Sequence, residues 1–145
     1  MTAPETPAAP RSFSLGEFHF SVLGPDCADE DFRAVTSSEA HLTGLFGSDW
    51  PKGLTWARNL ADLQRHAREF DEKFAFAWVV RNATGGYLGC VYLQPEGLER
   101  HARTVFLWLQ VSESSVELVA DLVQRLKVWM PEAGYDPERY TFITP

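Results

Sequence analysis

The chain lacks several features that would assign it to a class of proteins at once. Its two cysteines, Cys27 and Cys90, are far apart and lack the CxxC spacing of a zinc or redox motif. No apolar run approaches the roughly 18 residues of a membrane span. The segment 1–11 has neither the basic start nor the apolar stretch of a secretory signal. We therefore expect a cytoplasmic protein with no bound metal and no membrane partner.

Positive charge is also scarce. The 145 residues include 13 Lys and Arg against 20 Asp and Glu, which gives a formal net charge of −7. Nucleic acids and anionic membranes attract proteins with an excess of positive charge, so neither is expected as a partner. A cationic small molecule such as an amine would be attracted instead.

The chain does contain enough apolar material for one folded domain. Hydrophobic residues make up 45% of the sequence and aromatic residues 13%, which excludes a disordered protein. The length is typical of a single domain. Because residues 1–12 are rich in Pro and Ala, we predict a disordered tail there, followed by one domain over residues 13–145.

Alternating and helical patterns predict the order of the elements. They are a strand at 17–23, a helix over 26–46 broken near 37–38, a helix over 55–72, strands at 74–82, 87–94 and 104–111, a helix over 114–130, and a strand at 140–144. The three central strands are apolar on both faces, so helices must cover both sides of the sheet. We predict an α/β (α+β) fold with a mixed, mostly antiparallel sheet of about five strands.

The second helix carries polar residues beside its apolar stripe. Asp62 and His66 are four residues apart and therefore adjacent on a helix surface. A carboxylate can orient an imidazole for base catalysis, and a solvated surface pair gives the same pattern. Trp50, in the loop before this helix, either covers the edge of the core or forms a wall of a ligand cleft.

The order of elements from Phe18 onward resembles that of the GNAT superfamily of N-acetyltransferases. Several stretches also resemble a group of small bacterial GNAT-like proteins: Phe46-Gly47, Trp50-Pro51, Asn59-Leu60-Ala61-Asp62-Leu63, His66, Glu69-Phe70 and Leu88-Gly89-Cys90-Val91-Tyr92. The resemblance implies a GNAT-like domain that uses acetyl-CoA as co-substrate and acylates a small amine.

The resemblance also implies where acetyl-CoA would bind. In the superfamily, the strand equivalent to 104–111 ends in a Leu-x-Val pattern, and its splayed backbone pairs with the pantetheine arm. A glycine-rich loop then places the pyrophosphate at the next helix N-terminus. The equivalent cofactor-binding residues are Leu109, Gln110, Val111, Ser112, Ser114 and Ser115. We expect a V-shaped cleft between the strands that end at Gln94 and Val111 if the pantetheine site is kept.

The junction 112–117 departs from the superfamily pattern, because it has no glycine and no arginine. Ser114 and Glu117 fit a capping box that would occupy the helix amides. Glu113 and Glu117 would each oppose a nearby phosphate by about 1 kcal/mol, against about 0.3–1 kcal/mol gained from the helix dipole. This junction, together with the end of the sequence at Pro145, favours the alternative of a catalytically inactive small-molecule or protein-binding module.

Acetyl transfer needs a base for the ammonium and an acid for the thiolate. The residue types available are Glu96, Glu99 and His66 as bases, and Tyr92 or Tyr140 as acids. We take Glu96, His66 and Tyr140 as the candidates, although no local motif marks any of them. The exposed edge at Phe142 is a candidate surface for a homodimer.

Overall fold

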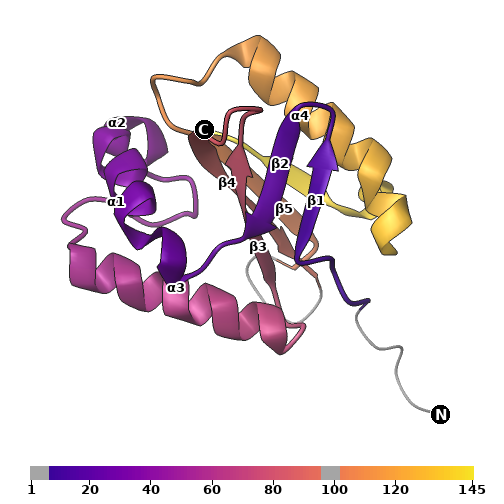
Figure 1. The fold of residues 1–145 in the computed structure, drawn as a ribbon, viewed down its shortest axis with the longest axis horizontal. Coiled ribbons are helices and arrows are strands. Elements are labelled where there is room, and N and C mark those ends of the chain that lie inside the picture. Colours follow the sequence, from indigo (N-terminus) through magenta and orange to yellow (C-terminus); the bar gives the residue numbers. More distant parts are fainter. Residues whose placement is uncertain (1–6, 96–101) are drawn as a thin grey trace.

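The computed structural model describes residues 7–95 and 102–145. Its centre is a six-stranded sheet in the order β1-β2-β3-β4-β5-β6 (Figure 1). The strands are β1 (Ser12–Leu15), β2 (Phe18–Val22), β3 (Phe76–Arg81), β4 (Tyr87–Gln94), β5 (Thr104–Leu109) and β6 (Thr141–Ile143). Neighbouring strands are antiparallel except β5 and β6, which are parallel. The predicted mixed, mostly antiparallel sheet is confirmed, with one strand more than expected.

Helices cover both faces of the sheet, as the two-sided apolar strands require. The helices are α1 (Ala28–Ser37), α2 (Glu39–Leu42), α3 (Trp56–Asp71) and α4 (Val116–Trp129), with 3-10 turns at Pro25–Cys27, Met130–Ala133 and Pro137–Arg139. Figure 1 shows α1, α2 and α3 on one side of the sheet and α4 on the other. The break between α1 and α2 falls at Ser38, as predicted. Thr55 is the N-cap of α3, because its hydroxyl accepts the Arg58 N–H at 3.2 Å.

The predicted cap of α4 is wrong by one residue. The Ser114 N–H bonds the Gln110 carbonyl at 3.0 Å, so Ser114 still belongs to the turn after β5. Ser115 is the N-cap, and its hydroxyl accepts the Leu118 N–H at 3.1 Å. Glu117 is therefore the second helical residue, one short of the position that a capping box needs.

The extra strand comes from a segment that includes the end of the predicted tail. β1 pairs with β2 from Ser12↔Ser21 to Leu15↔Phe18, across a turn in which Gly16 has a φ of +59°. Further contacts hold the segment before β1, because the Tyr135 hydroxyl donates to the Pro7 carbonyl at 2.6 Å and the Trp78 indole donates to the Pro10 carbonyl at 2.9 Å. Residues 7–12 thus differ from the predicted disordered tail, and residues 1–6 lie outside the described part.

The centre of the sheet is closed between β4 and β5. These strands pair from Gly89↔Leu109 to Gln94↔Thr104, and a Cβ on Gly89 would lie 2.0 Å from the Trp108 carbonyl oxygen. The predicted V-shaped cleft between the strands ending at Gln94 and Val111 is therefore wrong, because antiparallel strands have their C-termini at opposite ends of the pair. The strand that shares its direction with β5 is β6.

Candidate functional site

The parallel pair β5 and β6 is only three residues long. It runs from Thr104↔Thr141 to Phe106↔Ile143, whereas β5 continues to Leu109. The Gln110 N–H donates to the Leu88 carbonyl at 2.7 Å, so by the alternation of an antiparallel ladder the Leu109 N–H and C=O point away from β4. No described residue pairs with Leu109 in that register. β5 therefore has an open backbone edge just before α4.

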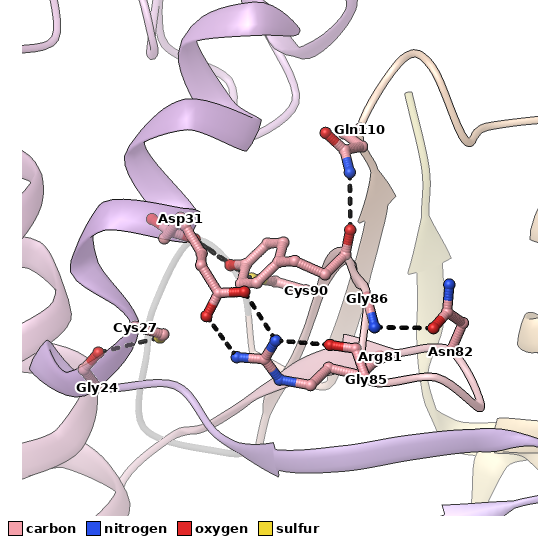
Figure 2. A network of polar contacts seen from close by, with 11 residues as sticks. Gly24, Cys27, Asp31, Arg81, Asn82, Gly85, Gly86, Cys90 and Gln110 are labelled. Atoms are coloured by element: carbon pink, nitrogen blue, oxygen red, sulfur yellow. Dashed lines mark hydrogen bonds and ion pairs between the residues drawn. The ribbon is translucent and has the colours of Figure 1, made fainter.

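A groove of about 790 Å³ lies beside this edge, at the junction of β5, α4 and β6. Of the six predicted cofactor residues, Val111, Ser114 and Ser115 line it. Leu109 is fully buried in the core under α4, and Ser112 is exposed in the turn and outside the groove lining. Gln110 turns to the other face, where its side-chain N–H donates to the Tyr87 carbonyl at 2.7 Å (Figure 2).

The backbone amides at this junction are partly occupied. The Glu113 and Ser114 amides bond the Gln110 carbonyl, and the Leu118 amide bonds the Ser115 hydroxyl. Within the described residues, the Val116 and Glu117 amides have no acceptor, as expected for the first turn of a helix. Two N–H groups at the positive end of the α4 dipole therefore remain open to a ligand.

The acidic side chains of the junction do not line the groove. Glu113 instead lines a separate open groove on the opposite face of the sheet, together with Arg33 of α1, and Glu117 is exposed. The predicted repulsion of a phosphate is therefore weaker than the sequence suggests, because charge effects fall with distance and solvent screening.

One contact works against a pantetheine site. The Val111 N–H donates to the Ser38 hydroxyl at 2.9 Å, and Ser38 is only 2% exposed. Val111 is the last residue of the Leu-x-Val pattern, whose backbone would pair with the ligand. Sequence reasoning missed this contact, because a serine at a helix break usually caps its own helix.

A second, smaller pocket of about 230 Å³ lies on the other face, between α1, α3, β4 and the loop 43–55. Phe46, Trp50 and Tyr92 contribute aromatic walls, with ring centroids 5.0 Å apart for Phe46–Trp50 and 5.3 Å apart for Phe46–Tyr92. The His66 ring packs on the Tyr92 ring, with their centroids 5.3 Å apart. Trp50 therefore lines a ligand-sized pocket, which was one of the two readings of its position.

His66 is held in its neutral form. Burial, reinforced by the nearby Arg65 charge, lowers the pKa of His66 to about 3 from an ordinary 6.5. Asp62 also lines the pocket, but its carboxylate lies 3.8 Å from Arg65 and has no hydrogen bond to His66. The predicted pair thus shares one pocket without the contact that would orient the imidazole.

Behind the pocket is a buried polar network that the sequence did not reveal. Asp31 is 3% exposed and accepts hydrogen bonds from the Tyr87 hydroxyl and, at 2.8 Å, from Asn59. Burial raises the pKa of Asp31, while these hydrogen bonds oppose the rise. Figure 2 shows Asp31 beside Cys90. In an adjacent pair, Arg81 donates to both carboxylate oxygens of Glu30, at 2.8 and 2.9 Å. The network joins α1 to α3, β3 and β4.

The structure places the two described catalytic candidates, His66 and Tyr140, on opposite sides of the sheet. Tyr140 packs on the core under α4, with its ring centroid 6.2 Å from that of Tyr135, and lies on the opposite side of the sheet from His66. Glu96 and Glu99 lie outside the described residues. In the described ranges no cluster of three or more His, Cys, Asp or Glu residues could hold a metal ion, and no helix is long and apolar enough to cross a bilayer.

The arrangement of elements is that of the GNAT acetyltransferases. The microcin C7 self-immunity acetyltransferase MccE, in complex with acetyl-CoA and AMP, aligns with a TM-score of 0.68 at 12% identity, over 91% of this chain and 73% of that one. RimL, the ribosomal L7/L12 α-N-protein acetyltransferase, in complex with CoA, aligns with a TM-score of 0.67 at 11% identity, over 92% of this chain and 73% of RimL. The ribosomal-protein-S5-alanine acetyltransferase from Vibrio fischeri aligns with a TM-score of 0.63 at 14% identity, over 85% of this chain and 68% of that one.

No protein-family model matches the chain, and no curated protein matches it in sequence. The chain therefore has the GNAT fold, with sequence identities too low to carry an activity by themselves.

Proposed function

We propose that the protein is an acyl-CoA-dependent N-acyltransferase of the GNAT type that acts on a small amine. The observation that carries the proposal is the groove of about 790 Å³ beside the open edge of β5, at the N-terminus of α4. Similar structures include RimL with CoA and MccE with acetyl-CoA and AMP, which supports acetyl-CoA as the co-substrate.

The groove has the chemistry that CoA needs. Val111, Val119 and Phe142 offer apolar contacts to the pantetheine arm. The hydroxyls of Ser114 and Ser115 and the open amides of α4 can donate to the pyrophosphate, where the helix dipole favours an anion. Among the residues that the structure describes, no arginine or lysine lines the groove, so we expect weaker binding than in a site that pairs phosphate with cations.

The chemical step forms a bond from the amine nitrogen to the acyl carbon and breaks the bond from that carbon to sulfur. The attacking amine loses a proton, and the departing thiolate gains one. Glu96 and His66 as acceptors of the first proton and Tyr140 as donor of the second remain proposals. His66 suits a role as a neutral hydrogen-bond acceptor better than as a strong base, because its pKa of about 3 makes its conjugate acid unfavourable.

The test is calorimetric titration with acetyl-CoA. We expect micromolar to submillimolar binding that falls at least tenfold in Ser115→Glu, because the new carboxylate would line the groove. The control is Ser112→Glu, which adds the same charge on an exposed side chain outside the groove lining. Absence of heat at millimolar acetyl-CoA would overturn the proposal.

The second candidate function is a GNAT-fold binding module without catalysis. The hydrogen bond from Val111 to Ser38 favours it, because the chain itself occupies a backbone donor at the ligand edge. In the same titration this function predicts no response to acetyl-CoA in the wild type or in either variant. A homodimer through the β6 edge and a cytoplasmic location are further parts of the proposal.

A further inference from the structure

Buried polar side chains gather at the two ends of α1. Apart from tyrosine and cysteine, the buried polar or charged residues of the described chain are Asp31, Ser38, Asn59 and Thr104. The first three fix α1, since Asp31 and Asn59 bond each other near its start and Ser38 is its C-cap. A buried polar group is unfavourable unless it is hydrogen-bonded, so these contacts define where α1 lies.

The start of α1 is attached to three other elements. The Asp31 carboxylate accepts the Asn59 amide of α3 at 2.8 Å and the Tyr87 hydroxyl of β4. The preceding residue, Glu30, accepts two hydrogen bonds from Arg81 of β3, at 2.8 and 2.9 Å. Two adjacent carboxylates therefore set the position of α1 relative to α3, β3 and β4.

The other end of α1 touches the edge of the groove. Ser38 comes seven residues after Asp31, which corresponds to about 10 Å along a helix. Its hydroxyl accepts the Val111 N–H at 2.9 Å, and its carbonyl accepts the Leu42 N–H of α2 at 2.9 Å. One helix thus connects the buried carboxylates to the backbone that follows the open edge of β5.

The contact at Ser38 is more sensitive to position than the apolar packing of α1. The middle of the helix packs through Ala34 and Val35, which are 3% and 1% exposed, and such contacts are not directional. A hydrogen bond weakens steeply once its heavy atoms separate beyond about 3.5 Å, so a displacement of about 1 Å at Ser38 breaks its bond to Val111.

We propose that the polar contacts of Asp31 and Glu30 form a positioning device that holds Ser38 on the Val111 N–H and so keeps the ligand edge of the groove partly closed. In the alternative arrangement α1 shifts by about 1 Å and the Val111 N–H becomes free for a ligand. The effect on acetyl-CoA rests on the proposed function, whereas the dependence of the Ser38 contact on these carboxylates does not.

The first test measures exchange of the Val111 amide by NMR, without any ligand. Asp31→Leu keeps the approximate shape of the side chain and leaves Asn59 and Tyr87 without their acceptor. We expect Val111 exchange to accelerate at least tenfold relative to the slowest amides of β4. The Val111 chemical shift should also move towards that of Ser38→Ala, which removes the same contact directly. Unchanged exchange in folded Asp31→Leu would overturn the proposal.

A conservative variant separates positioning from a general loss of stability. Asp31→Asn can still bond both neighbours, because the Tyr87 hydroxyl accepts as well as donates. Its Val111 exchange should stay within threefold of the wild type, and acceleration equal to that of Asp31→Leu would contradict the proposal. Leu126→Ala is the stability control, because Leu126 is buried in the core under α4 and should leave Val111 exchange relative to β4 unchanged.

A second variant serves if Asp31→Leu does not fold. Arg81→Met removes the partner of Glu30, and both side chains of this pair are partly exposed, so folding should be kept. We expect Val111 exchange to accelerate at least threefold, and an unchanged rate would overturn the proposal.

Titration with acetyl-CoA distinguishes this inference from the proposed function. Asp31→Leu should bind acetyl-CoA at least threefold more tightly than the wild type, and faster Val111 exchange without tighter binding would contradict the closing role. Faster exchange with no acetyl-CoA binding in any variant keeps the positioning device and removes the acyltransferase. Acetyl-CoA binding with unchanged Val111 exchange removes the device and keeps the acyltransferase.

Discussion

The groove at α4 and the pocket at α3 lie on opposite faces of one sheet and differ in nearly every respect. The groove is about 790 Å³ and open, and it presents hydroxyls and backbone N–H groups at the positive end of a helix. The pocket is about 230 Å³ and more enclosed, and it presents acceptors and aromatic rings. The donors of the groove suit an anion, whereas the pocket combines aromatic rings with the Arg65 guanidinium, the Asp62 carboxylate and a neutral imidazole, so the two sites suit different ligands.

The largest expected effect comes from disrupting the pairing of β4 and β5 in the sheet that supports both sites. Gly89→Ala forces a Cβ to within 2.0 Å of the Trp108 carbonyl oxygen, so β4 and β5 must separate. We expect a loss of about 3 kcal/mol or more in the free energy of unfolding, measured by urea titration, together with loss of acetyl-CoA binding. Gly24→Ala is the control, because its new Cβ would meet only ordinary contacts at 3.4 Å or more. Retention of wild-type stability in Gly89→Ala would contradict the closed pairing of β4 and β5.

Acidic pH should lower the free energy of unfolding through His66, which lines the pocket and not the groove. The folded-state pKa of His66 is about 3, below its ordinary value of 6.5, so the unfolded chain binds the proton more readily. The stability that this provides is fully present above pH 6.5 and is lost as the pH falls from 6.5 towards 3. We expect about 3 kcal/mol of this loss between pH 7 and pH 4, measured by urea unfolding.

The matched variants for this pH effect are His66→Phe and His19→Phe. The first should flatten the pH dependence, and the second should keep it, because His19 is exposed on β2. An identical acid dependence in the wild type and His66→Phe would show that the pocket does not hold the imidazole neutral.

The Ser38 contact offers a way to change the groove alone. Ser38→Ala leaves the Val111 N–H without its acceptor, which should cost about 1 kcal/mol in stability. If pantetheine pairs with this amide, acetyl-CoA should bind severalfold more tightly. Ser37→Ala is the control, because its hydroxyl bonds the Ala34 carbonyl within α1. Weaker acetyl-CoA binding in Ser38→Ala would mean that the bond supports the groove.

The smallest expected effect concerns self-association. β6 has β5 as its single strand neighbour in the described sheet, and the Lys127 ammonium lies 5.1 Å from the Phe142 ring centroid. A dimer through this edge should be weak and should be reduced by Phe142→Lys, as measured by light scattering across a concentration series. A monomeric wild type at millimolar concentration would exclude it and leave both ligand sites within one chain.

The fold was largely predictable, because its signals are local. The apolar strands on both faces, the Thr55 cap and the break at Ser38 each depend on neighbouring residues. β1 was missed because its four residues are half-exposed and carry little periodic signal. The cap of α4 moved by one residue because the Gln110 carbonyl holds Ser114 in a turn, a detail that two adjacent serines cannot reveal.

The sites were less predictable, because they depend on contacts between distant segments. Ser38 meets Val111 across 73 residues, and Asn59 meets Asp31 across 28. The sequence places Gln94 at the end of a strand but does not reveal that its side-chain oxygen is buried, because that burial depends on elements distant in the sequence. His66 was noticed for its spacing from Asp62, yet its neutral state comes from burial and the nearby Arg65 charge.

Two aromatic walls of the pocket, Phe46 and Trp50, come from residues 43–55, which form neither helix nor strand. The groove shares no residue with this loop. Randomising these two aromatic positions would therefore change the pocket while leaving the lining of the groove in place. Because Leu45 of the loop belongs to the core, its two aromatic positions, rather than the whole loop, are the places where the pocket can be varied.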